Sequence, residues 1–123
     1  MSAATPPPAA ADAVVRAQAL VARLWERFRP LAESRVETIE QYLQPEAGPS
    51  RERNRADRAA LTRAQEAAHN LAGALGTYGR PEGSALALRI EHLLTDPTAE
   101  AGDPAHAALL VDLAQRLRTE VTR

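Results

Sequence analysis

The sequence predicts an all-α protein, an antiparallel four-helix bundle with an additional helix at the N-terminus. Apolar residues recur at intervals of three and four along five segments, which is the spacing of amphipathic helices. Aromatic residues make up only 3% of the chain, and no sustained alternation of Val, Ile and Thr indicates a sheet. With 123 residues, of which 45% are hydrophobic, the chain suits one domain with one core.

The N-terminal third predicts a tail and two helices. Residues 1–11 contain three consecutive prolines and predict a flexible Pro/Ala-rich tail, while residues 12–123 form the predicted bundle. Asp12 suits the N-cap of a first helix. Pro30 disfavours helical geometry at Arg29, so we expect this helix to break or kink there and a second helix to follow. The apolar positions are Val14, Ala17, Val21, Leu24, Trp25 and Phe28 in the first helix and Ala32, Val36, Ile39 and Leu43 in the second.

The remaining chain predicts three more helices. A loop is expected at residues 45–50, and a third helix starts within RERNRAD and ends at about Gly79. A fourth helix, over residues 81–94, opens on a proline, and a fifth runs from about Asp103 to the end. Because each apolar stripe is one-sided and most connections are short, we expect the helices to pack antiparallel. The stripes are Leu61, Ala64, Ala68, Leu71, Leu75 and Tyr78 in the third helix and Leu110, Leu113, Leu117 and Val121 in the fifth.

Composition and charge exclude several classes of function. The formal net charge is -1 and the pI is about 6.3, so we expect no general attraction to nucleic acid or to an anionic membrane. The absence of cysteine excludes disulfides, thiolate catalysis and Cys-based zinc sites. No apolar run reaches membrane-spanning length and no secretory signal is present, so a cytoplasmic location is expected. The three histidines lie in different predicted helices without i, i+4 pairing, so no metal site is expected.

His69 lies on the predicted third helix with glycines around it. At about 100° per residue, its side chain points about 130° away from the apolar seam, toward solvent. Gly73 and Gly76 project to the same side, as do Thr62 and Glu66. A helical glycine costs about 1 kcal/mol relative to alanine, and on an exposed face it gains nothing from core packing. We therefore interpret His69 as a reactive imidazole, and the glycines as positions without side chains that let the surface of another protein approach it.

The stretch HNLAGALGTYG, residues 69–79, resembles the signature of histidine phosphotransfer (HPt) domains of bacterial two-component phosphorelays. That signature is His, any residue, Leu, Lys, Gly, and then a second Gly ten residues after the His. Ala68 before the histidine and the segment PEGSALALRIEHLL after the motif, with its late glutamate, agree with the family as well. The resemblance covers about residues 12–121 and implies an HPt-like four-helix bundle. The matching positions are His69, Leu71, Gly73 and Gly79.

The resemblance implies a phosphocarrier rather than an enzyme. His69 would be phosphorylated, and the phosphoryl group would pass to or from an aspartate in the receiver domain of a response regulator or hybrid histidine kinase. Mg²⁺ is expected on the receiver, with no cofactor in this chain. An imidazole suits this role because its ordinary pKa of about 6.5 leaves much of it neutral at cytoplasmic pH. The residues expected to contact the partner are Thr62, Gln65, Glu66, Ala72, Gly73 and Gly76.

Ala72 departs from the family signature, which often has lysine at this position. In the family that lysine is thought to offset phosphate charge and to help partner contact. Counting about 1.5 Å per residue along antiparallel helices places Arg35 and Arg89 level with His69, so either guanidinium is a candidate to stabilise the phosphate. Alternatively, both arginines pair with surface acids such as Glu37 or Glu91. The alternative function is a docking or adaptor bundle that binds a receiver or kinase without efficient phosphotransfer.

Overall fold

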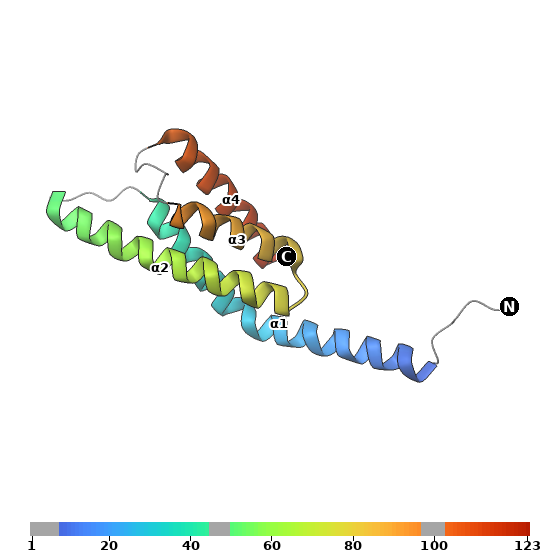
Figure 1. Ribbon diagram of the computed structural model, residues 1–123. Helices are drawn as coiled ribbons and strands as arrows, with labels where there is room; N and C mark the ends of the chain where they lie inside the picture. Colours follow the sequence, from blue (N-terminus) through green and yellow to red (C-terminus); the bar gives the residue numbers. More distant parts are fainter. Residues whose placement is uncertain (1–7, 45–49, 97–102) are drawn as a thin grey trace.

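The computed structural model describes residues 8–44, 50–96 and 103–123, and side chains for all of these except residues 8 and 50–56. Within these ranges the chain forms four α-helices and no strand. α2 and α4 each pack on both α1 and α3, so the helices close into an antiparallel ring around one core (Figure 1). The predicted all-α four-helix bundle is confirmed. The helices are α1 (Pro8–Leu43), α2 (Ser50–Thr77), α3 (Pro81–Thr95) and α4 (Pro104–Thr122).

One apolar core runs along the bundle and receives side chains from every helix. Fully burying a side chain of this size contributes about 1.5–3 kcal/mol, so the core holds the helices together. An aromatic cluster closes one end, where the Phe28 ring stacks on Tyr78 with centroids 4.9 Å apart and Trp25 lies 6.0 Å from both. The largest fully buried side chains are Ile39, Leu71, Leu75, Ile90, Leu113, Leu117, Val36 and Val121.

Of the break or kink expected at Pro30, the break is wrong, because α1 runs through this proline as one helix. The additional N-terminal helix is therefore the first half of α1. A proline inside a helix removes one backbone hydrogen bond and costs about 3 kcal/mol. Pro30 is exposed, so water has access to the backbone on that side. On the opposite side, Trp25 before the proline and Ala32 and Val36 after it are buried in the same core, and their burial outweighs the cost.

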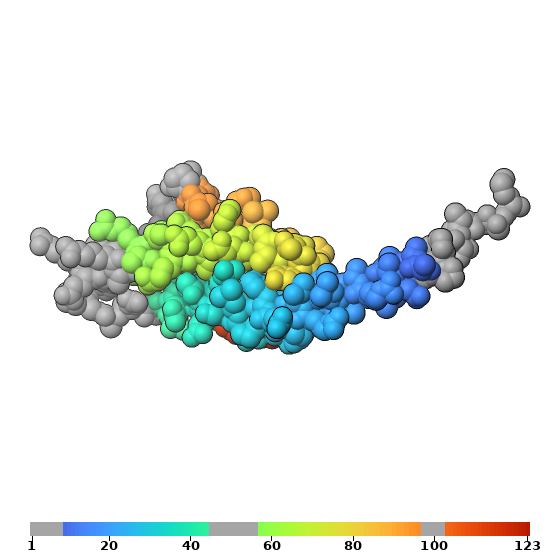
Figure 2. Space-filling model, turned by 90° about the horizontal axis from the view of Figure 1, so that it is seen from below, coloured from blue at the N-terminus to red at the C-terminus, as the bar shows by residue number. Residues whose placement is uncertain are grey.

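The N-terminal part of α1 projects beyond the other helices, as Figure 2 shows. The helix begins at Pro8 rather than Asp12, because the alanine-rich start has a high helix propensity. Residues 8–11, predicted to be flexible tail, are therefore helical, while residues 1–7 lie outside the described part. Residues 9–24 are all exposed. The exposed large apolar side chains on this projecting segment are Val14, Val15, Leu20, Val21 and Leu24.

Deletion of residues 1–16 is expected to leave the stability of the bundle nearly unchanged. Residues 9–16 are all exposed, so their removal takes little apolar surface from the core. We expect the Tm to stay within about 3 °C of the full chain, the shift that corresponds to less than about 1 kcal/mol in a domain of this size. Thermal melts followed by circular dichroism measure it. A Tm lowered by about 10 °C would show that the projecting segment supports the bundle.

The turn between α2 and α3 explains the last glycine of the motif. Gly79 has a φ of 71°, a left-handed conformation that favours glycine. Its N–H donates to the carbonyl of Gly76 at 3.2 Å, and the N–H of Arg80 donates to that of Leu75 at 2.8 Å. This pair of bonds is the Schellman motif, which ends a helix. Pro81 then opens α3 at a position where its missing N–H has no intrahelical partner to lose.

Candidate functional site

His69 lies on the side of α2 that faces away from the core, which we call the free side of α2. Its side chain is 73% exposed. Its neighbours Ala68 and Leu71 are fully buried, so α2 cannot rotate to cover the imidazole without exposing the core. The exposed orientation predicted from helical periodicity is confirmed, and it follows from the apolar seam on the opposite side of the same helix.

One polar contact orients the imidazole. Nδ1 of His69 lies 2.9 Å from Oε1 of Glu91, which projects from α3. The Glu91 side chain is only 21% exposed, so its carboxylate is held against the bundle. An ionised carboxylate can only accept hydrogen bonds, so Nδ1 carries a proton in this contact, and in the neutral form of the ring Nε2 then keeps its lone pair. The site therefore offers Nε2 as a nucleophile on an exposed ring.

The two glycines on the His69 side of α2 differ in their surroundings. A Cβ added at Gly73 would meet nothing within 4 Å, so open space lies one helical turn from His69. A Cβ added at Gly76 would lie 3.5 Å from Oγ of Ser84 in α3, which is ordinary van der Waals contact. Gly73 therefore leaves a bare patch beside the imidazole, whereas Gly76 lies against the neighbouring helix.

The other residues predicted to contact a partner divide into two groups. Thr62 and Glu66 are exposed on the free side of α2. Gln65 and Ala72 are half-buried instead: the Gln65 amide donates to the carbonyl of Leu94 at 2.8 Å, and Ala72 packs against the core. Both lie where α2 meets α3 and are less exposed than Thr62 and Glu66, and their contact with a partner stays a prediction.

The two arginines proposed to stabilise the phosphate have other surroundings in the structure, and their role at His69 stays a prediction. The Arg35 guanidinium lies over the Phe28 ring, 5.6 Å from its centroid, and that ring stacks on Tyr78 just after the end of α2. Arg89 lines a groove between α3 and α4. Equal height along a bundle does not imply proximity. Arg89 is two residues from Glu91, which places it about 200° away around α3, on a different face from the contact with α2.

The other two histidines do not join His69. His92 is exposed on α3, and His106 is half-buried in the first turn of α4. Across residues 8–44, 50–96 and 103–123, no group of three or more His, Asp or Glu side chains is arranged to hold a metal ion. No helix in the described part of the chain has the length and apolar character needed to cross a membrane.

Comparison with known families agrees with the histidine motif. The model of the family described as Hpt domain matches residues 23–122, which covers most of the chain and includes His69. The chain belongs to the Hpt domain family. Hpt domains are phosphocarriers that serve histidine phosphotransfer in two-component signalling. The match begins close to Trp25, where the bundle begins, and leaves out most of the projecting segment of α1. No curated protein and no solved structure matches the chain.

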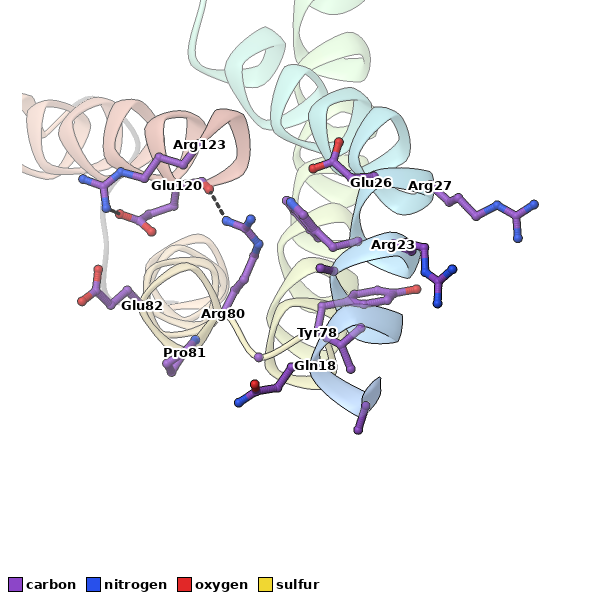
Figure 3. Close-up of a pocket in the computed structure, with 15 residues that line it drawn as sticks. Gln18, Arg23, Glu26, Arg27, Tyr78, Arg80, Pro81, Glu82, Glu120 and Arg123 are labelled. Carbon is purple, nitrogen blue, oxygen red and sulfur yellow. Dashed lines mark hydrogen bonds and ion pairs between the residues drawn. The ribbon is translucent and has the colours of Figure 1, made fainter. Parts of the chain in front are cut away.

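A groove of about 1170 Å³ lies at one end of this Hpt domain, between α1 and the turn that joins α2 to α3 (Figure 3). Arg80 lies across it, with its guanidinium 4.0 Å from the centroid of the Trp25 ring and donating to the carbonyl of Glu120 at 2.9 Å. Burial lowers the pKa of Arg80 from its ordinary value, and the positive charge of Arg29 lowers it further. His69 does not line this groove, so the groove is separate from the exposed imidazole.

Sequence reasoning missed the role of α3 in the site of this Hpt domain. In the sequence, Glu91 is identifiable only as a late glutamate and as an acid that can pair with an arginine, whereas in the structure it contacts His69. Leu88 is 45% exposed and lies between Ser84 and Glu91, the two α3 side chains that bond to α2. Because residues four and three apart lie on one side of a helix, Leu88 is on the same side of α3 as Ser84 and Glu91 and borders the surface around His69. A helical angle taken for α3, as for α2, could have found both residues.

Proposed function

We propose that this Hpt domain relays a phosphoryl group through His69, to or from an aspartate of a receiver domain, in the cytoplasm. The contact between His69 Nδ1 and Glu91 carries the proposal, because in the neutral form of the ring it places the proton on Nδ1 and leaves the lone pair on Nε2 of an exposed side chain. The open space at Gly73 supports it, since a second protein has access to the imidazole there. Membership of the Hpt family supports the same chemistry in general terms.

In the proposed reaction, the Nε2 lone pair attacks the phosphorus of an aspartyl phosphate on the receiver. An N–P bond forms while the P–O bond to the aspartate breaks, and the carboxylate leaves with that electron pair. The imidazole ring gains positive charge as the new bond forms. The Glu91 carboxylate, bonded to the Nδ1 proton, stabilises this charge. The receiver supplies Mg²⁺ and its own acidic pocket, and the same steps in reverse return the phosphoryl group.

We infer that the receiver docks on the free side of α2 and the adjoining edge of α3. The exposed residues there are small or polar around His69, with Thr62, Glu66 and Gly73 on α2. Leu88 adds one exposed apolar side chain from α3, the kind of contact that stabilises the centre of an interface. A surface without large side chains around the imidazole is needed, because the receiver must bring its aspartate into contact with Nε2. The partner is the receiver of a response regulator or of a hybrid histidine kinase.

Incubation with a phosphorylated receiver tests the proposed function. We expect an acid-labile, base-stable label, the behaviour of phosphohistidine, to appear on this chain as the receiver loses its phosphoryl group. A chain that binds the receiver and takes no label would overturn phosphotransfer. That result would support the docking-only alternative, which Ala72 favours because it stands where the family signature has lysine. A chain that neither binds nor takes label from any receiver of the same cell would overturn both.

Replacement of Glu91 by glutamine is expected to slow transfer by about tenfold, since a hydrogen bond to a charged group contributes about 1.5–3 kcal/mol. The variant keeps the size of the side chain and loses the charge that stabilises the phosphorylated ring. Glu82→Gln is the matched control, because Glu82 is an exposed acid on the same helix that lines the groove at the end of the bundle. Rapid-quench kinetics measure the transfer rate of each. Equal rates in Glu91→Gln and the wild type would show that the carboxylate plays no part in transfer.

A further inference from the structure

Three polar contacts cross between α2 and α3 beside His69. On α2 they fall at successive turns, so they form a ladder along the helix contact. The contact of the imidazole is the middle one. The pairs are Ser84 Oγ with the Ala72 carbonyl at 2.6 Å, His69 Nδ1 with Glu91 Oε1 at 2.9 Å, and Gln65 Nε2 with the Leu94 carbonyl at 2.8 Å.

The two outer contacts each join a side chain of one helix to a backbone carbonyl of the other. The Leu94 carbonyl lies in the last turn of α3, where carbonyls have no partner within the helix, and Gln65 supplies one from α2. The Ser84 hydroxyl donates in the opposite direction, from α3 to the Ala72 carbonyl within α2. A backbone carbonyl moves with its helix as a whole. Each bond therefore ties the position of one helix to that of the other.

Apolar packing and the polar bonds together determine how α3 sits on α2. Ala64 and Ala68 of α2 and Ala87 of α3 are fully buried, and they are small and alike in shape. Their burial is non-directional, so it changes little when one helix turns or slides slightly against the other. The contact between Glu91 and His69 is sensitive to such movement, because hydrogen bonds weaken steeply when their angle departs from linear.

Gly76 makes room for one of the outer contacts. Its missing side chain leaves Ser84 Oγ close to α2, at 3.5 Å from where a Cβ would lie. A side chain at this position would begin beside the Ser84 hydroxyl, which donates to the Ala72 carbonyl. Gly76 thus belongs to the contact between the two helices.

We propose that Ser84 and Gln65 are positioning residues for His69: their bonds on either side of the imidazole hold α3 in the register that keeps Glu91 on Nδ1. Loss of both bonds lets α3 shift, weakens the contact of Glu91 with Nδ1 and frees the ring to place its proton on Nε2. A ring protonated on Nε2 has no lone pair there for phosphorus. The effect on transfer rate rests on the proposed function, whereas the effect on the ring proton does not.

The test compares Ser84→Ala, Gln65→Met and the double variant with the wild type. Ring ¹⁵N chemical shifts of His69, measured by NMR on the neutral imidazole, report which nitrogen carries the proton. We expect the proton to lie mainly on Nδ1 in the wild type and to move toward Nε2 in the double variant. The transfer rate should fall by about tenfold, as in Glu91→Gln, because the same charged hydrogen bond is weakened.

Two further variants separate positioning from a general loss of stability. Ser84→Thr keeps the hydroxyl and should retain the wild-type ring shifts and rate. Thr119→Ala removes a hydroxyl whose bond, to the Gln115 carbonyl at 3.1 Å, stays within α4, and it should leave the His69 ring unchanged. If the double variant does not fold, the same ring shifts in the two single variants decide the question.

Wild-type ring shifts in the folded double variant, with or without a lower Tm, would overturn the positioning role. If Ser84→Thr shifts the ring as far as Ser84→Ala, the hydroxyl is not responsible, and the proposal for Ser84 fails. Failure of the proposed function gives a different result: the wild-type chain then takes no phosphoryl group from any receiver. In that case the ring shifts still show whether Ser84 and Gln65 hold Glu91 on Nδ1.

Discussion

Replacement of His69 by glutamine is expected to reduce the phosphoryl label on this chain to background. Glutamine has no nucleophilic ring nitrogen, while its size is close to that of histidine and its amide can still donate to Glu91. The His69 side chain is 73% exposed, so the substitution should change the free energy of unfolding by no more than about 0.5 kcal/mol. Binding to the receiver should persist, because the surface around residue 69 is otherwise intact.

The matched controls are His92→Gln and His106→Gln. Both histidines lie on other helices, and neither contacts His69 or Glu91 in the hydrogen bonds of the site, so both variants should take label as the wild type does. Labelling by a phosphorylated receiver, followed by acid and base treatment, measures all three proteins side by side. Acid-labile label that survives in His69→Gln would place the phosphoryl group on another residue and overturn the assignment.

Replacement of Gly73 by arginine is expected to lower the transfer rate by about 100-fold, which corresponds to about 2.7 kcal/mol of lost docking free energy. A Cβ at this position meets nothing within 4 Å, so the new side chain fits the free domain and occupies the space that the receiver needs. Arginine also has a higher helix propensity than glycine, by close to 1 kcal/mol. The Tm should therefore stay level or rise while transfer is lost.

Two variants make the Gly73 result specific. Gln115→Arg adds the same charge at an exposed position of α4, a helix that packs on α1 and α3, and it should transfer at the wild-type rate. Gly73→Ala should raise the Tm by a few degrees, through about 1 kcal/mol of helix propensity, with only a small loss of rate. Wild-type transfer by Gly73→Arg would exclude this surface from receiver docking. Unfolding of Gly73→Arg would contradict the open space around the glycine.

Gly76 is a less direct probe of docking than its position in the sequence indicates. Helical periodicity places it on the same side of α2 as His69 and Gly73, which is why the sequence predicted one bare face. In the structure it lies against Ser84 of α3. An arginine at Gly76 would therefore lie beside the contact between helices as well as on the exposed side of α2, so a loss of transfer there would not by itself report docking.

The sequence by itself determined the features that repeat along one helix. Spacing of three and four residues placed Leu71 and Leu75 in the core and His69 in solvent, because one face of an amphipathic helix is buried. The end of α2 was also predictable from the sequence, since Gly79 adopts a left-handed φ that favours glycine. The break predicted at Pro30 is wrong because the local cost of a helical proline, about 3 kcal/mol, is outweighed by burial of core residues before and after it in the chain.

Only the tertiary structure decided which side chains meet across two helices. Counting residues along antiparallel helices placed Arg89 level with His69, whereas in the described part of the chain the contact from α3 to the imidazole comes from Glu91, two residues later. The two differ by about 200° around α3, and the direction that each faces depends on how α3 is rotated and slid against α2. Packing of the whole core sets that rotation, together with directional bonds such as that of Ser84 to the Ala72 carbonyl. A periodic pattern within one segment carries no information on this relation, because it describes each helix relative to its own axis.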